Sequence, residues 1–455
     1  MDTPAAMTLA QVRALSPDAL HELRMRKLRK QIAYCWDRSP LYRSRLQAAG
    51  AEPRDIRNWD DFRRLPVLMN KQIERESQEE SQVKSGHPLG MHLCADPAEV
   101  NCICGTSGST GQPTFTYLYT REDLRDVRML WGRMLEWMGM KPGERVLHGF
   151  GMSMWAMGAP LTTALLDNGY NLIPAGAEAG AERILRFAEL FRPRLLMGTP
   201  SLVEHLIERA PQILGKPVSE LGIERIYCSG EPGASIPAVR KRVQEAYGAQ
   251  LFDGMGGGWA RAAITCAGEH SHGLHELTPD YMIWGDDLVD PQTHQSMEVQ
   301  DGAIGKVLTT ALEHRARPVL KYDTGDVAQV YTARCECGFE GRRVRIIGRA
   351  DDMVIVRGVN VYPSAVRSVV ASFAPRCTGA MLIVLREPPP RAASPLDVKV
   401  EHEASLDEDG RNALKEELAA AIRSRLRFTA NILLVKPDEL QVTDKGKSPL
   451  VERAY

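Results

Sequence analysis

The chain lacks the features that mark secreted, membrane-spanning or nucleic-acid-binding proteins. It has no run of about 18 apolar residues, so we expect no segment to span a bilayer. Its opening residues, MDTPAAMTLAQV, contain an early acid and no long apolar run, unlike a secretory signal. The 57 Lys and Arg balance 58 Asp and Glu, which leaves no basic excess to attract nucleic acid or a membrane. Nine scattered cysteines, an odd number, predict reduced thiols and a cytoplasmic protein.

The length and the order of segments predict several domains. A chain of 455 residues is too long to fold around a single hydrophobic core. Its contents of 44% hydrophobic and 25% charged residues are ordinary for a globular protein. Between about residues 145 and 248, apolar strand-like segments such as RVLHGF and RLLMGTPS alternate with helical ones such as GAERILRFAELFRP. This alternation predicts an α/β fold with doubly wound, mostly parallel sheets.

The remaining regions differ in composition and in the secondary structure that they predict. Residues 16–46 are predicted to form one helix, and the chain from there to about residue 93 is polar and rich in turns, with LPVLMNK as a short structured interruption. From about Leu274 to Ile347 strands and turns predict a β-rich subdomain. The C-terminal residues are predicted to form a small α+β unit, and the boundary between it and the preceding domain is expected near Gly348 to Asp351. We therefore predict a large domain over 1–348 and a small mobile one over 349–455.

The stretch GTSGSTGQPT, from Gly105 to Thr114, lies between the strand-like runs VNCIC and FTYLYT. Glycine permits conformations and close approaches that a Cβ atom forbids. Bare N–H groups and hydroxyls together form a cradle for anions, most often phosphate. A surface turn with solvated hydroxyls is the alternative for such a loop in isolation.

Four further motifs follow in order along the chain. CSGEP ends a strand where an open α/β sheet binds its ligands, and KYDTGDVAQV places Asp326 on a tight turn. IIGRADDMVIVRGVNVYP crosses the expected domain boundary, and TDKGKSP carries Lys447 between glycine and serine near the end. Taken singly, these motifs are also compatible with a helix cap, a hairpin turn, a linker and a solvated tail.

In this order and spacing the motifs resemble those of the adenylate-forming superfamily of acyl-CoA ligases, and most of all its phenylacetate–CoA ligase branch. SPLYRSRL, LPVLMNK and GTPS elsewhere in the chain are also similar to that branch. The resemblance implies that a set of residues binds ATP: Thr106, Ser107, Gly108, Ser109, Thr110, Gly111, Gly230, Glu231, Pro232, Asp253, Asp326 and Arg349.

The resemblance also implies a reaction. ATP and a carboxylic acid form an acyl-adenylate with release of pyrophosphate, and the thiol of coenzyme A then attacks it. Lys447 would stabilise charge in the first step, Mg²⁺ would accompany ATP, and Asp351 would be the pivot on which the small domain rotates. The partners expected are an aryl carboxylic acid, ATP and CoA, with no nucleic acid or membrane; a homodimer is left open.

Two positions depart from the family's pattern. Where the family has Tyr-Gly-x-Thr/Ser-Glu, this chain reads LFDGMGGGWA, so that Asp253 replaces the tyrosine and Gly257 the glutamate that binds Mg²⁺. Phe252 is a candidate to supply the missing ring. Gln112 stands in the phosphate loop where lysine is common. These changes weaken the expectation of ATP-driven ligation and leave the fold unaffected.

Cysteines and histidines suggest a metal site. RCECGFEGR supplies Cys335 and Cys337, and TCAGEHSHGLHE supplies Cys266 with His272 and His275 among its histidines. Sulfur-rich tetrahedral sets favour zinc, and some members of the branch carry a structural zinc at similar places. The alternative is buried free cysteines beside a surface histidine cluster.

The segment HGFGMSMWAMGAP matches the place where the branch builds its acid pocket. Met152, Trp155 and Met157 would form an adaptable apolar wall for an aromatic or arylalkyl acid, although the same run is also compatible with ordinary core. Two other functions remain open. The acyl group could pass to an amine or a carrier-protein thiol, or the protein could be a degenerate member that binds nucleotide without turnover.

Overall fold

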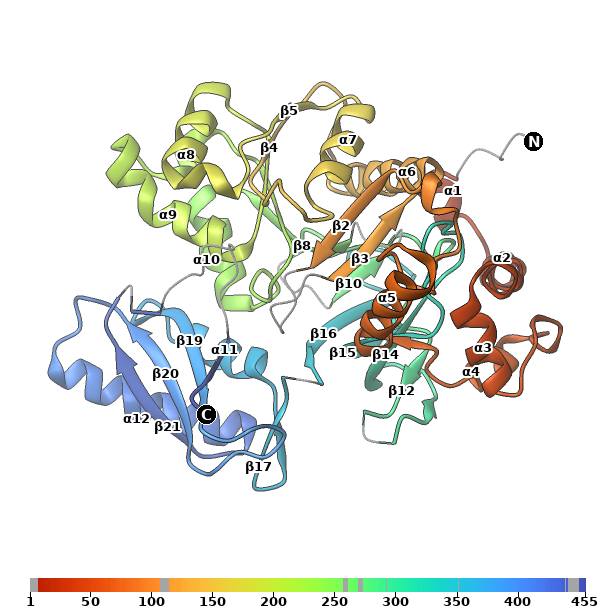
Figure 1. Cartoon of the computed structure of the whole chain (residues 1–455). Coiled ribbons are helices and arrows are strands. Elements are labelled where there is room, and N and C mark those ends of the chain that lie inside the picture. Colours follow the sequence, from red (N-terminus) through yellow and green to blue (C-terminus); the bar gives the residue numbers. More distant parts are fainter. Residues whose placement is uncertain are drawn as a thin grey trace.

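The structure is a computed structural model that describes residues 7–106, 114–256, 261–268, 273–291, 293–350, 352–437, 439–440 and 450–455. Helices dominate the N-terminal region, in red and orange in Figure 1, up to the antiparallel pair of strands β2 and β3. The elements of this region are α1 (Leu9–Arg13), α2 (Pro17–Arg38), α3 (Pro40–Ala48), α4 (Trp59–Arg63), β1 (Met69–Asn70), α5 (Lys71–Ser85), β2 (Cys102–Thr106), β3 (Thr114–Tyr119) and α6 (Arg121–Trp137).

Two predictions for this region are wrong. The single helix expected over 16–46 is broken at Ser39, whose extended backbone (φ −111°, ψ 117°) is the conformation favoured before a proline. The Ser39 hydroxyl then caps α3 by accepting from the Tyr42 N–H at 3.2 Å. The turn-rich stretch expected up to residue 93 contains α5, whose sequence is so polar that its helical period was hidden.

The predicted alternation of strands and helices is confirmed between residues 145 and 256. The strands are β4 (Arg145–His148), β5 (Asn171–Ile173), β6 (Leu195–Gly198), β7 (Arg225–Cys228) and β8 (Gln250–Gly256). The helices between them are α7 (Ala159–Asp167), α8 (Gly180–Phe191), α9 (Pro200–Leu214) and α10 (Pro237–Tyr247). The strands pair in parallel in the order β8, β7, β6, β4, β5.

Successive side chains of these strands point to opposite faces of the sheet, because a strand has a period of two. Leu195 and Met197 pack into the cluster that contains α6 and α7, whereas Leu196 packs into the cluster that contains α8, α9 and α10. Helices therefore cover both faces, which confirms the doubly wound arrangement and places the carboxyl ends of the strands at one edge.

Beyond β8 the sheet continues with mostly antiparallel strands, which form the predicted β-rich subdomain, while β1 pairs with β15 in parallel. Its order runs from β8 through β9, β10, β16, β15, β14 and β12 to β13, with β1 beside β15 and β11 beside β14. The bounds are β9 (Ala262–Ile264), β10 (Leu274–Glu276), β11 (Met282–Ile283), β12 (Leu288–Val289), β13 (Ser296–Met297), β14 (Ile304–Ala311), β15 (Tyr322–Tyr331) and β16 (Arg343–Arg349).

The small C-terminal domain, blue in Figure 1, lies beneath α10 and has its own α/β core. Its elements are β17 (Val354–Val356), β18 (Val359–Val361), α11 (Pro363–Ala371), β19 (Cys377–Leu385), β20 (Leu396–His402), α12 (Glu408–Leu426), β21 (Ala430–Val435) and β22 (Val451–Arg453). These strands and helices confirm the small α+β unit that was predicted for the C-terminal residues. None of the helices in the described part of the chain is long and apolar enough to cross a membrane.

Candidate active site

Asp326 and Arg349 face each other at paired positions of β15 and β16. Asp326 is only 8% exposed; its Oδ2 accepts a hydrogen bond from Thr324 Oγ1 at 2.8 Å, and its Oδ1 lies 3.6 Å from Arg349 Nη1. Arg349 Nη1 also donates to the Thr324 carbonyl oxygen at 3.0 Å. A carboxylate has about four acceptor positions, so this one is held in place and can still accept from a pair of ligand hydroxyls.

The SGEP loop follows β7 at the carboxyl edge of the sheet. Gly230 has φ +96°, a conformation that side chains with a Cβ rarely adopt. Glu231 Oε1 accepts a hydrogen bond from the Ser201 N–H at 2.8 Å, in the first turn of α9. The Pro232 carbonyl oxygen accepts one from Arg367 Nη1. The Glu231 carboxylate therefore joins the SGEP loop to the GTPS segment, and the backbone of the SGEP loop contacts the C-terminal domain.

One turn of α11 brings the two motifs together. The Ser364 hydroxyl donates to the Ile347 carbonyl oxygen near the end of β16, and Arg367 of the same helix reaches Pro232. Residues three apart lie on one face of a helix. The SGEP loop and the strand that carries Arg349 therefore meet at one face of α11, although β7 and β16 are not neighbours in the sheet.

Asp253 lies on β8 beside this edge. Its carboxylate accepts from the Ser235 hydroxyl, and its N–H donates to Thr265 Oγ1 at 2.9 Å. Burial raises the pKa of Asp253 to about 6, against the opposing effect of the Ser235 hydrogen bond. Phe252, the candidate for the missing ring, is 2% exposed and packs into the hydrophobic core.

The segment predicted to form an acid pocket leads from β4 to α7. Met152, Trp155 and Met157 are half-buried in it, and Glu178 fixes the turn by accepting from the Met152 N–H at 2.9 Å. The Gly105 N–H donates to the Met154 carbonyl oxygen at 2.8 Å. This segment therefore lies against β2, the strand that precedes the predicted phosphate loop.

Several predicted residues lie outside the described part of the chain. The phosphate loop from Ser107 to Gly111 is among them, while Thr106 is described only as the last backbone position of β2. The others are Gln112, Gly257, His272, Asp351 and Lys447. Their roles stay predictions from the sequence.

Arg261 is a charged residue that the sequence analysis missed. It precedes β9, is 8% exposed, and its guanidinium lies 4.9 Å from the centroid of the Trp284 ring. Burial lowers its pKa, and Asp326 is the foremost charge that opposes this effect. Within the part of the chain that the structure describes, Nε and Nη1 have no hydrogen-bond partner. Such donors suit an anionic oxygen, and the signal was a lone arginine in the apolar run ARAAITC.

Four predicted metal ligands converge from separate segments. The ligand atoms of Cys266, His275, Cys335 and Cys337 all lie within 4.8 Å of one another. His275 Nδ1 donates to the Ile264 carbonyl oxygen at 3.2 Å, which leaves Nε2 facing Cys337 Sγ at 3.3 Å. A tetrahedral zinc with bonds of about 2.0–2.3 Å holds its ligand atoms just under about 4 Å apart. The donor set and the oriented histidine fit zinc.

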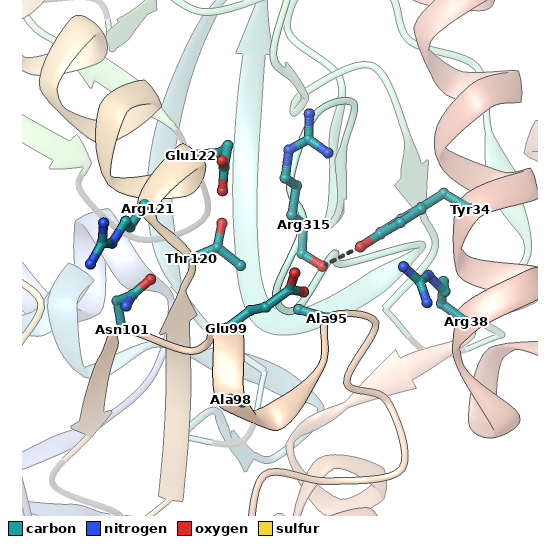
Figure 2. Close-up of a pocket in the computed structure, with 10 residues that line it drawn as sticks. All are labelled: Tyr34, Arg38, Ala95, Ala98, Glu99, Asn101, Thr120, Arg121, Glu122 and Arg315. Carbon is teal, nitrogen blue, oxygen red and sulfur yellow. Dashed lines mark hydrogen bonds between the residues drawn. The ribbon is translucent and has the colours of Figure 1, made fainter. Parts of the chain in front are cut away.

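An open polar pocket of about 480 Å³ lies elsewhere, between α2 and the start of α6 (Figure 2). The side chains of Arg38, Arg121 and Arg315 line it, and Tyr34 donates to the Arg315 carbonyl oxygen at 3.1 Å. Among the described residues, none predicted to bind nucleotide, acid or metal lines this pocket. It is separate from the candidate active site.

Comparison with known proteins agrees with this arrangement. The AMP-binding enzyme C-terminal domain family matches residues 358–452. The phenylacetate-coenzyme A ligase of Thermus thermophilus is 28% identical over 460 residues, which cover 96% of this chain and 97% of that one. The Escherichia coli phenylacetate-coenzyme A ligase is also 28% identical, over 94% of this chain and 93% of that protein.

Solved structures of a 2-hydroxyisobutyryl-CoA ligase are similar across 99% of this chain and 94% of theirs, at 25% identity. The TM-score is 0.86 for that ligase in its postadenylation state and 0.69 for it in the thioesterification state. The chain is thus similar to acyl-CoA ligases of the adenylate-forming superfamily. Its similarity to phenylacetate-coenzyme A ligases extends over nearly its whole length.

Proposed function

We propose that the protein is an AMP-forming ligase that joins an aromatic or arylalkyl carboxylic acid to coenzyme A through an acyl-adenylate. The observation that carries the proposal is that the SGEP loop and the strand that carries Arg349, the partner of Asp326, meet at one face of α11. The likeness to phenylacetate-coenzyme A ligases over nearly the whole of both chains supports the same conclusion.

The candidate site residues have the following roles in this proposal. Asp326 accepts from the ribose hydroxyls, Arg349 holds that carboxylate, and the SGEP backbone lines the adenine. Arg261, buried close to Asp326, offers its unused donors to anionic oxygens at the reacting centre. Lys447 stabilises the charge that develops in adenylation. The domain boundary is placed between residues 348 and 349, with Asp351 as the pivot.

Met152, Trp155 and Met157 are proposed to form the wall against which the acid packs. Their half-buried side chains lie on a segment that the Gly105–Met154 hydrogen bond joins to the start of the phosphate loop. An apolar wall beside the triphosphate suits an uncharged ring whose carboxylate must reach the α-phosphate.

Two metals belong to the proposal. Cys266, His275, Cys335 and Cys337 would hold a structural zinc, which ties β9, β10 and the turn before β16 together. Mg²⁺ would accompany ATP, held by phosphate oxygens, water and Thr110 because Gly257 offers no carboxylate.

The identity of the acid substrate is tested by measuring thioester formation with a panel of carboxylic acids. Purified protein is incubated with ATP, Mg²⁺ and CoA, together with phenylacetate, benzoate, anthranilate or 2-hydroxyisobutyrate. We expect acyl-CoA, AMP and pyrophosphate in equal amounts with an aryl acid and little with the small aliphatic acid. A clear preference for the aliphatic acid would refute the aromatic assignment, and AMP release without acyl-CoA would point to another acceptor.

A further inference from the structure

The relative placement of the two domains corresponds to one stage of the reaction. The same 2-hydroxyisobutyryl-CoA ligase matches this chain with a TM-score of 0.86 in its postadenylation state but 0.69 in its thioesterification state. Sequence identity and coverage are the same in both comparisons, so the difference lies in the conformation. The present structure therefore has the arrangement that precedes thioester formation.

Three charged side chains join the domains in this arrangement. Arg367 of α11 donates to the Pro232 carbonyl oxygen of the large domain, and Arg242 of α10 donates to the Thr378 carbonyl oxygen of the small domain at 3.2 Å. Glu204 of α9 lies between the two arginines: it accepts from Arg242 Nη2, and its Oε2 is 3.8 Å from Arg367 Nη2. Each domain thus donates one hydrogen bond to the other's backbone.

The contact is buried and belongs to no motif that the sequence analysis identified. The side chains of Arg367 and Glu204 are 7% and 12% exposed. One turn after Arg367 in α11, Ala371, 3% exposed, packs into the hydrophobic cluster of the large domain and not into that of its own domain. The Arg242 side chain is 33% exposed. Removing the Glu204 charge would leave Arg242 and the buried Arg367 facing each other with no opposite charge between them, which is costly.

The same contact includes the adenine-side loop. Arg367 binds the carbonyl oxygen of Pro232, and Glu231, the residue before it, binds the first turn of α9, from which Glu204 projects. A small domain that rotates away must give up the Arg367–Pro232 bond, because its donor and acceptor are in different domains. The domain arrangement and the nucleotide loop are therefore mechanically linked.

We propose that Glu204, Arg242 and Arg367 form a clasp that stabilises the arrangement preceding thioester formation and must open for the thioester step. They are positioning residues: they act through the Pro232 carbonyl and the placement of the small domain and do not touch the reacting atoms. The stage assigned to the clasp rests on the proposed function. The effect of the clasp on the domain arrangement does not depend on the proposed function.

The first test measures the domain arrangement directly in ligand-free protein. Spin labels on non-natural amino acids are placed at two exposed positions, Gln212 on α9 and Lys415 on α12, and the distance distribution is recorded. E204Q should lower the ratio of clasped to unclasped molecules by about tenfold, a change in line with losing one charged hydrogen-bond partner. The control is E417Q, which removes a bidentate pair with Arg376 inside the small domain and should keep the wild-type distribution.

The second test separates the clasp from general stability. Without CoA, E204Q should release more acyl-adenylate into solution per pyrophosphate formed than wild type or E417Q. Thioester formation from supplied acyl-adenylate and CoA should be as fast as in wild type, or faster. R367K, which keeps the charge, should lie between wild type and E204Q in the distance measurement.

An E204Q distance distribution identical to that of wild type would overturn the clasp, as would equal slowing of both half-reactions with unchanged adenylate retention. Failure of the proposed function would look different. Wild type would then form no pyrophosphate with any acid, while the E204Q shift in the distance distribution would still be observed.

Discussion

Asp326 and Arg349 form a cross-strand pair in which the carboxylate Oδ1 lies 3.6 Å from the guanidinium Nη1. Thr324 holds the other carboxylate oxygen, so the orientation of Asp326 is fixed before any ligand binds. We predict that D326N raises the KM for ATP by about 10- to 100-fold, the range expected for losing hydrogen bonds to a charged acceptor. Steady-state kinetics with ATP varied provides the measurement.

The matched control for D326N is D323N on the same strand, β15. Asp323 pairs with Lys306 and accepts from the Gly325 N–H at 2.8 Å, so its loss perturbs the start of β15 without removing the proposed ribose acceptor. An equal rise in KM for both variants would show that the stability of this strand segment, and not the Asp326 carboxylate, determines ATP binding.

Asp253 should make stability depend on pH. Burial raises its pKa to about 6 in the folded protein, above the ordinary value of about 4. The folded state therefore holds more protons than the unfolded state between these values, and stability falls as pH rises through that window. We expect D253N to match wild type at pH 4 and to exceed it at pH 8 by on the order of 2 kcal/mol in the free energy of unfolding. Equal pH profiles from urea denaturation would contradict the raised pKa.

The magnesium requirement tests the alignment of Gly257 with the absent glutamate. An ion held by water, phosphate oxygens and Thr110 binds more weakly than one with a carboxylate ligand. Wild type should therefore need unusually high Mg²⁺, and G257E should saturate at lower concentration, when the adenylation rate is titrated against Mg²⁺. Saturation of wild type at the low Mg²⁺ typical of a carboxylate site would show that the alignment is wrong.

Zinc should copurify at about one ion per chain, because three cysteine sulfurs and one histidine nitrogen already converge. C335S should lose the metal and melt at lower temperature, since structural zinc contributes directly to folding stability. C102S, which removes a free thiol outside this cluster, should retain both the zinc and the melting temperature. Tag-free protein without zinc, with all nine thiols titrating freely, would rule out the site.

The sequence predicted the parts of the fold whose patterns are local. The strands β4, β6 and β7 are short apolar runs that end at turns, and amphipathic helices follow them, so periodicity alone identified them. The polar helix α5 was missed because its buried residues are polar. Glu74 forms an ion pair with Arg317 and accepts a hydrogen bond from the Tyr322 hydroxyl, where a typical buried helix face would make apolar contacts. A hydrophobic period cannot reveal a helix that is buried through polar contacts.

Candidate site residues could be predicted where they belong to a recognisable motif. They could not be predicted where only the tertiary structure brings them together. Asp326, Glu231 and the cysteines were singled out from the sequence because their motifs are recognisable; the structure shows that the cysteines converge with His275, while the ligands of Asp326 and Glu231 stay predictions. Arg367 and Glu204 are separated by more than 160 positions in the chain, and only the docking of α11 brings them together. The roles assigned to the phosphate loop, Asp351 and Lys447 stay predictions.

ATP–pyrophosphate exchange in the absence of CoA tests the central claim most directly, because it reports the reversible formation of an acyl-adenylate. With an aryl acid present, label from pyrophosphate should enter ATP in wild type. In K447A the exchange should fall by two or more orders of magnitude, the effect of removing a donor worth roughly 3–4 kcal/mol in the transition state, while supplied acyl-adenylate should still react with CoA. Exchange that is absent with every acid, or unchanged in K447A, would contradict the account.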